Sequence, residues 1–149
     1  MDNLFSKIQK DLTDALKQKD EVKTSTLRLV ISEVGNARIA KGGDLADEEI
    51  IEVISKEAKK RRESIVAFKS GNRSDLAQKE EKELAILKTY LPEAISQEEL
   101  AKIIEGAIDE VGAKDMKDLG KVMSAVISKV KGRAEGSTVA TIVKSKLSS

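Results

Sequence analysis

The sequence predicts an all-α fold built from seven helices. Apolar side chains recur at spacings of three and four residues through most of the chain, which is the period of a helix with one buried face. No stretch shows the strict alternation of a half-buried strand. Aromatic residues make up only 2% of the chain and charged residues 36%, so we expect amphipathic helices packed around an aliphatic core.

The first part of the chain is expected to form an N-terminal four-helix domain, residues 1–95. Its helices are predicted at about 2–19, 21–41, 47–70 and 75–90, and the last two should form a long antiparallel hairpin. Arg61 falls on the apolar stripe of the third helix, where an unpaired charge is unfavourable. We therefore interpret Arg61 and its basic neighbours as members of structural ion pairs rather than as a ligand site.

A single proline marks the main boundary. Pro92 lacks an N–H and disfavours helical geometry at Leu91, so the fourth helix should end before it. Ser96 and Glu99 then form a capping box, which predicts the start of a C-terminal three-helix domain, residues 96–149. Its helices are predicted at about 97–111, 115–130 and 138–147.

The residue types that are missing exclude most catalytic chemistry. The chain has no Cys and no His, which removes disulfides, cysteine nucleophiles, histidine bases and the common zinc, haem and iron–sulfur sites. It also has no phosphate-binding glycine loop followed by Lys-Ser/Thr, and no Gly/Ser-rich nucleophile loop. We therefore expect no catalytic residue, no metal, no cofactor and no independent enzymatic activity.

The N-terminal segment predicts a location. It lacks the apolar region of a secretory signal, and no apolar run approaches the length of a membrane span. We expect a cytoplasmic protein that makes no contact with a membrane.

Charge is distributed unevenly along the chain. Residues 1–95 carry 18 basic and 18 acidic side chains, residues 96–113 carry one and five, and residues 114–149 carry eight and three. The excess of positive charge in the last segment indicates a polyanionic partner. The candidate nucleic-acid-binding residues there are Lys121, Lys129, Lys131, Gly132, Arg133 and Lys144.

These candidates are predicted to gather around the connection between the last two helices. Gly132 and Gly136 keep that connection free of bulk, and the first N–H groups of the last helix suit a phosphate. Gly120, Ser124 and Ser128 form a line of small residues at a spacing of four, which suits close approach of a partner. A structural interpretation stands beside this one, in which the cations complement a helix dipole and the small residues admit a neighbouring helix of the same chain.

Two stretches of the sequence carry a family resemblance. The first contains Arg61-Arg62-Glu63-Ser64-Ile65 and Gly71-Asn72-Arg73-Ser74-Asp75-Leu76, and it continues to Tyr90-Leu91-Pro92. The second joins Gly120-Lys121-Val122-Met123 to Lys131-Gly132-Arg133-Ala134-Glu135-Gly136. Together they resemble the YqeY family of small bacterial proteins over essentially the whole chain. The second stretch also resembles the tail domain of the B subunit of the glutamine-dependent aspartyl/glutamyl-tRNA amidotransferase (GatB).

The resemblance implies a helical N-terminal domain followed by a three-helix tail module, and in the amidotransferase that tail contacts tRNA. The family label of a carbon–nitrogen ligase with glutamine as amido-N-donor describes relatives, because the residues for that chemistry are absent here. Ala46 and Ser124 depart from the family pattern. Because the Ala46 side chain cannot cap a helix, Asp44 or Asp47 is expected to cap the third helix.

The leading hypothesis is a non-catalytic, tRNA-associated helical protein, with tRNA or a tRNA-linked enzyme as its partner. The alternative is a protein–protein adaptor that docks a partner through its helical surfaces.

Overall fold

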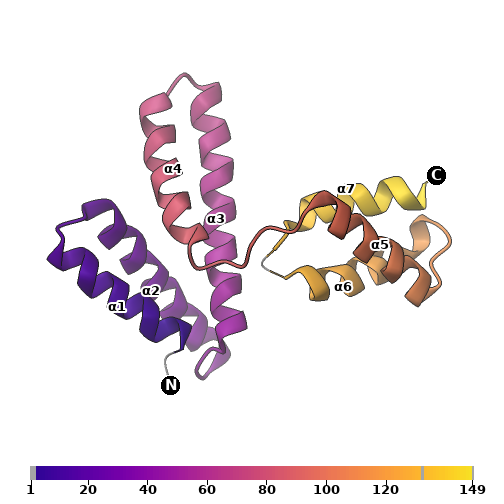
Figure 1. Cartoon of the computed structure of the whole chain (residues 1–149), viewed down its shortest axis with the longest axis horizontal. Helices are drawn as coiled ribbons and strands as arrows, with labels where there is room; N and C mark the ends of the chain where they lie inside the picture. The colour runs from indigo at the N-terminus through magenta and orange to yellow at the C-terminus, as the bar shows by residue number, and fades with distance from the viewer. Residues whose placement is uncertain (1–2, 132, 149) are drawn as a thin grey trace. The chain divides into compact units, whose positions relative to one another are not determined.

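The computed structural model describes residues 3–131 and 133–148, and this part of the chain is helical without strands, which confirms the predicted fold class. The chain divides into two compact units, Met1–Leu91 and Pro92–Ser149. The first unit holds α1 (Leu4–Lys17), α2 (Glu21–Lys41), α3 (Asp47–Ser70) and α4 (Ser74–Lys88) (Figure 1). The second holds α5 (Gln97–Val111), the short 3-10 helix η1 (Met116–Asp118), α6 (Leu119–Val130) and α7 (Gly136–Leu147).

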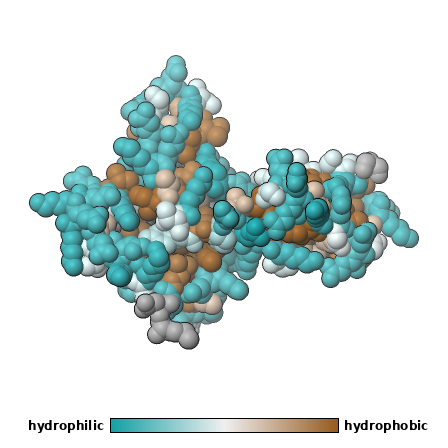
Figure 2. Space-filling view, in the orientation of Figure 1, coloured by the Kyte–Doolittle hydropathy of each residue, from teal (hydrophilic) through white to brown (hydrophobic). Residues whose placement is uncertain are grey.

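The first unit consists of two helical hairpins, α1–α2 and α3–α4 (Figure 1). Each helix turns an aliphatic stripe inward, because burying apolar surface is the main favourable term in folding. The centre of the core is formed by fully buried side chains from all four helices, namely Ile8, Leu27, Val30, Val34, Ile50, Ile54 and Leu87. Hydrophilic side chains cover most of the face of each unit that Figure 2 shows.

The start of α3 differs from the expectation. Ala46 is the N-cap residue, and its N–H donates to Glu49 Oε1 at 3.0 Å. Asp47 instead accepts from the backbone N–H of Leu4 at 3.2 Å, which ties the start of α3 to the start of α1. Neither Asp44 nor Asp47 caps α3. The Glu49 side chain accepts the N–H of Ala46 instead, and the Asp47 carboxylate is occupied by its contact with Leu4.

The turn between α3 and α4 contains an asparagine in the left-handed conformation that glycine usually adopts at the end of a helix. Asn72, and not Gly71, takes the left-handed conformation, with φ of 59° against −89° at Gly71. Asparagine tolerates this region better than most residues with a side chain. At its other end α4 stops at Lys88, two residues earlier than predicted, and the Thr89 hydroxyl donates to the Ile86 carbonyl at 2.7 Å.

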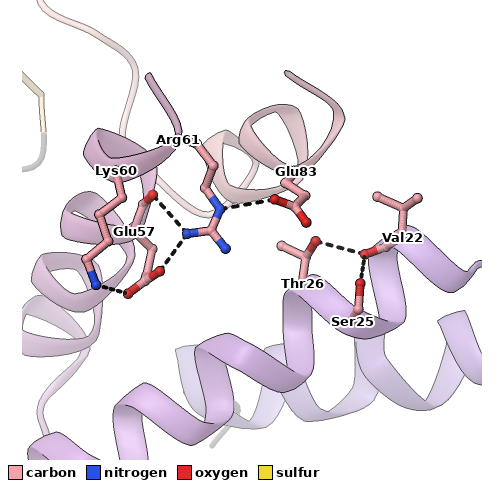
Figure 3. A network of polar contacts seen from close by, with 7 residues as sticks. All are labelled: Val22, Ser25, Thr26, Glu57, Lys60, Arg61 and Glu83. Atoms are coloured by element: carbon pink, nitrogen blue, oxygen red, sulfur yellow. Dashed lines mark hydrogen bonds and ion pairs between the residues drawn. The ribbon is translucent and has the colours of Figure 1, made fainter. Parts of the chain in front are cut away.

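Arg61 is buried and forms ion pairs with two carboxylates, as predicted (Figure 3). Its Nη1 donates to Glu57 Oε2 at 2.6 Å and to the Glu57 carbonyl at 3.2 Å, while its Nε lies 3.5 Å from Glu83 Oε2 on α4. Lys60 Nζ adds a contact of 3.1 Å to the other oxygen of Glu57. The buried charges of α3 are therefore paired, and the network joins α3 to α4.

A second polar cluster joins α1 to the end of α4. The Tyr90 hydroxyl donates to Asp11 Oδ2 at 2.6 Å, and Lys7 Nζ lies 3.1 Å from the same oxygen and 4.8 Å from the centre of the Tyr90 ring. Burial alone raises the pKa of Asp11, but the hydrogen bonds from Tyr90 and Lys7 outweigh it and lower the pKa below its usual value. Burial and the neighbouring carboxylate of Asp11 raise the pKa of Tyr90 well above its usual range.

The second unit packs α5, α6 and α7 around an aliphatic core of its own. The core side chains with the least exposure are Ile104, Ala107, Val122, Val126, Val130, Val139 and Val143. Figure 1 shows α6 and α7 running in opposite directions on either side of a short connection. In the described residues no helix is both long and apolar enough to cross a membrane.

Candidate nucleic-acid interface

The side of α6 that faces away from the core is exposed to solvent. Val122, Val126 and Val130 face the core at helical spacing, so the residues on the opposite side point to solvent. Gly120, Lys121, Ser124 and Ser128 are all exposed, and a Cβ added to Gly120 would meet no atom within 4 Å. The line of small residues is therefore not covered by a helix of the described chain, contrary to the structural interpretation of that line.

Arg133 has a structural role at the α6–α7 connection. Its Nε donates to the Glu93 carbonyl at 3.1 Å, and its Nη2 lies 3.5 Å from Glu99 Oε2. The carbonyl of Arg133 accepts from the N–H of Ile95 at 3.1 Å. These contacts fasten the connection to the segment in front of α5, so the Arg133 side chain is not free to hold a ligand.

Acidic residues of α5 pair with cations of α6 and α7. Lys129 Nζ lies 3.0 Å from Glu110 Oε2, and Lys146 Nζ lies 2.9 Å from Glu105 Oε1. Arg133, in the α6–α7 connection, likewise pairs with Glu99 of α5. Much of the charge gradient along the sequence is therefore neutralised inside the unit, and such exposed pairs add little stability.

The remaining candidates separate into two groups. Lys131 takes part in an interaction of its own, and Gly132 lies outside the described residues. The side chains of Lys121 and Lys144 are exposed, and their ammonium groups make no hydrogen bond or ion pair within the part of the chain that the structure describes. The ammonium group of Lys117, in η1, is exposed and unpaired in the same way.

The predicted gathering of all the cations around the α6–α7 connection does not occur. Ten helical residues, or about 15 Å of helix, separate Lys121 from Lys131. Because α6 and α7 run in opposite directions, Lys144 near the end of α7 also lies far from the connection (Figure 1). The structure thus places Lys129, Lys131 and Arg133 near the connection, and it places Lys117, Lys121 and Lys144 toward the other end of the hairpin.

Reasoning from the sequence missed Lys117 as a candidate and the α5 carboxylates as internal partners. The signal for the second was present, because residues 96–113 carry five acids against one base directly before the basic segment. In a unit of this size, oppositely charged helices have to be neighbours, and long side chains can then pair across them.

The described residues hold no cluster of three or more acidic side chains that could bind a metal ion. A shallow pocket between α5 and α7 is lined by Glu105, Ile108, Asp109 and Lys146. Its lysine is already paired with Glu105, so the pocket offers no free cation to an anionic ligand.

Comparisons with known proteins identify the protein family of this chain. The family model described as "Yqey-like protein" matches residues 5–147. A protein of Pyrenophora tritici-repentis named altered inheritance of mitochondria protein 41, mitochondrial, is 29% identical over 133 residues, which cover 88% of this chain and 73% of that protein. The protein of the same name from Vanderwaltozyma polyspora is 34% identical over 119 residues, which cover 75% of this chain and 64% of that protein. An uncharacterised protein of Schizosaccharomyces pombe is 35% identical over 94 residues, 63% of this chain and 76% of that protein.

The names of these relatives correct the predicted cellular location of the protein. Several relatives are named mitochondrial proteins, which contradicts the cytoplasmic location inferred from the N-terminal segment. The inference was wrong because a missing apolar segment argues only against a secretory signal. Mitochondrial targeting segments are amphipathic and basic rather than apolar, so that observation does not bear on them.

Proposed function

The chain belongs to the Yqey-like protein family, and we propose that it is a non-catalytic helical protein that binds the backbone of folded tRNA through its second unit. The observation that carries the proposal is the set of exposed lysines, Lys117, Lys121 and Lys144, that no carboxylate of the described chain neutralises. The resemblance of this unit to the tail of an amidotransferase subunit supports tRNA as the polyanion.

The geometry suits recognition of phosphates rather than bases. Lys117 in η1 and Lys121 in the first turn of α6 are four residues apart, and Lys144 extends from the antiparallel neighbour α7. The aromatic residues, Phe5, Phe68 and Tyr90, all belong to the first unit, so the second unit has no platform on which bases can stack. Binding through lysines alone reads the shape and charge of a folded RNA and weakens steeply with salt.

The exposed line of small residues contributes room for that contact. Gly120 and Ser124 lie beside Lys121 on the outward side of α6, where no side chain projects far. A sugar–phosphate backbone approaching this side therefore reaches the lysine ammonium groups without a steric barrier. The residues Lys129 and Arg133 have a different role, since each is already paired with a carboxylate of α5.

The test is tRNA binding across a salt series with a lysine-to-alanine triple variant at positions 117, 121 and 144. The parent should bind at about 50 mM salt, and the variant should bind much more weakly, with a slope of log affinity against log salt reduced by about 2. The control is Lys82→Ala with Lys88→Ala, two exposed lysines of α4 whose ammonium groups make no hydrogen bond or ion pair in the described chain, and this variant should bind like the parent.

Two results would refute the proposal. One is a parent protein that shows no tRNA binding at low salt. The other is a triple variant that binds as tightly as the parent and the α4 control, while its circular dichroism shows an intact fold. Arg133 is avoided as a test position because its loss disturbs the α6–α7 connection as well as removing a charge.

A second candidate function is supported by a separate observation. Met116 and Ile127 are exposed apolar side chains on the outward side of η1 and α6, in line with Gly120 and Ser124. This pattern favours docking of a partner helix, as in a protein–protein adaptor. Stoichiometric capture of one protein from nuclease-treated extract, abolished by Ile127→Asp but not by the triple lysine variant, would favour the adaptor over tRNA binding.

A further inference from the structure

The turn that leads from α5 into α6, residues 114–118, is fastened by its own two aspartates. The backbone N–H of Lys114 donates to Asp118 Oδ2 at 3.0 Å. The backbone N–H of Lys117 donates to Asp115 Oδ1 at 2.9 Å. A backbone hydrogen bond of 3.1 Å, from the N–H of Asp118 to the Asp115 carbonyl, closes the same turn. The backbone of the 114–118 turn is therefore fixed at both of its lysines.

Asp118 makes an unusual hydrogen bond for its position. It is the N-cap residue of α6, where an aspartate commonly accepts a hydrogen bond from the first turn of its own helix. Its side chain makes no such bond here, and the carboxylate accepts from the N–H of Lys114, four residues earlier, instead. The Asp118 carboxylate therefore serves the turn that carries Lys114 and not the start of α6.

Lys114 carries the same kind of charge as the lysines of the proposed tRNA contact. Its side chain is exposed, and its ammonium group makes no hydrogen bond or ion pair within the described residues. It precedes Lys117 by three residues, and Lys117 precedes Lys121 by four. Three lysines with unpaired ammonium groups therefore follow one another along the 114–118 turn and the first turn of α6.

We propose that Lys114 is a further phosphate-binding residue of this contact, and that Asp118 is the positioning residue that holds the turn carrying it. The inference rests on the proposed binding of tRNA by the second unit. A backbone that is already fixed before the RNA arrives reduces the conformational entropy lost when the lysines meet phosphates. The 114–118 turn thus presents Lys114 and Lys117 on a pre-organised backbone, beside Lys121 on α6.

The two aspartates make this turn neutral by charge count, since residues 114–118 hold two lysines and two aspartates. A carboxylate is negatively charged at neutral pH and by itself repels a polyanion. Holding the backbone in place favours RNA binding, whereas the negative charge of the same side chain opposes it. The two effects of Asp118 therefore have opposite signs, and variants that differ in only one of them can separate the two.

The first experiment measures tRNA binding of Lys114→Ala in the full chain across a salt series. Binding at about 50 mM salt should weaken about threefold or more, and the slope of log affinity against log salt should fall by about 1. The matched control is Lys102→Ala, which removes another exposed lysine of the second unit with an unpaired ammonium group. Lys102 lies on α5 between the acidic residues Glu98 and Glu105, so this variant should bind like the parent.

The second experiment compares Asp118→Ala with Asp118→Asn, which have equal charge. The amide oxygen of asparagine can still accept the N–H of Lys114, whereas alanine offers no acceptor. Asp118→Asn should therefore bind tRNA at least about threefold more tightly than Asp118→Ala. Hydrogen exchange at the Lys114 amide reports the same bond without RNA, and it should be faster in Asp118→Ala than in the parent or in Asp118→Asn.

The possible results separate this inference from the proposed function. Lys114→Ala binding like Lys102→Ala overturns the phosphate-binding role, and Asp118→Ala binding as tightly as Asp118→Asn overturns the positioning role even if the Lys114 amide exchanges faster. If the variants at 114 and 118 have no effect while the triple lysine variant loses binding, this inference fails and the proposed function stands. A parent that does not bind tRNA overturns both. Lys114→Ala removes no hydrogen bond of the described fold, so it decides its own role even if Asp118→Ala folds poorly.

Discussion

Removing the buried guanidinium of Arg61 in α3 should substantially lower the free energy of unfolding of the first unit. Arg61→Met keeps an unbranched side chain of similar reach but leaves Glu57 and Glu83 without the guanidinium between them (Figure 3). The Arg61 and Glu57 side chains are only 10% and 5% exposed, so water cannot replace the lost partner. Stranding a buried charge in this way typically costs about 3–5 kcal/mol, and the contact of Lys60 with Glu57 places the expected loss near the lower end.

The same hairpin offers an exposed pair as the control. Lys69 Nζ on α3 lies 2.9 Å from Glu81 Oε1 on α4, close to the 2.6 Å between Arg61 and Glu57, but these side chains are 61% and 44% exposed. Water and salt screen such a pair, so Lys69→Met should cost less than about 1 kcal/mol. The comparison therefore separates the effect of burial from the effect of distance.

Urea unfolding followed by tyrosine fluorescence suits the measurement. Tyr90 is the sole tyrosine, the chain has no Trp, and Tyr90 lies in the first unit, so the signal reports that unit alone. Adding Glu57→Met to Arg61→Met removes one of the stranded charges and should recover part of the loss. The reasoning fails if Arg61→Met costs no more than Lys69→Met, or if the double variant is less stable than Arg61→Met, since the loss would then come from packing.

Three further predictions follow from named contacts. Tyr90→Phe removes a hydrogen bond to Asp11 and should lower the free energy of unfolding by about 1–2 kcal/mol, measured by urea unfolding followed by circular dichroism because this variant has no tyrosine. The pKa of Asp11 is lowered in the folded state, so its carboxylate contributes to the stability of the protein at neutral pH, and this contribution is lost as pH falls through the lowered pKa. Because Tyr90→Phe removes a hydrogen bond that lowers this pKa, the variant should lose less stability in acid than the parent. Arg133→Gln removes the hydrogen bond to the Glu93 carbonyl and should lower the free energy of unfolding of the second unit by about 1 kcal/mol, seen by circular dichroism as a lower thermal midpoint; an unchanged midpoint would contradict the structural role. Gly112→Ala should cost about 1 kcal/mol by the same measurement, because φ is 67° there and no steric contact adds to the backbone strain.

The sequence was sufficient for the helices and for the pairing of Arg61. Periodicity shows which side of each helix is buried, and a charge on that side requires a partner, whichever helix supplies it. Helix ends were harder to predict because a cap depends on small local choices. At the start of α3, for example, Glu49 serves Ala46 while Asp47 reaches Leu4 of another helix.

The candidate site was predicted in its residue types but not in its arrangement. The basic excess of residues 114–149 is a property of the sequence, yet Lys129 and Arg133 are paired and Lys121 and Lys144 are not. Position along the chain cannot distinguish these lysines and arginines, because each pair joins residues 19 to 41 positions apart across packed helices. The family, in contrast, was recognisable from the sequence and is confirmed over residues 5–147.

The sequence by itself determined that this protein is helical, that it lacks the residues for common catalytic chemistry, and that its excess of positive charge lies in residues 114–149. These properties depend on composition and on spacing within one helix, which are local. The tertiary structure alone decided which cations form ion pairs, that the outward sides of α2 and α6 are exposed, and that Tyr90 donates a hydrogen bond to Asp11. Those outcomes depend on which helices pack against each other, because charge pairing and exposure are properties of neighbours in space rather than neighbours in sequence.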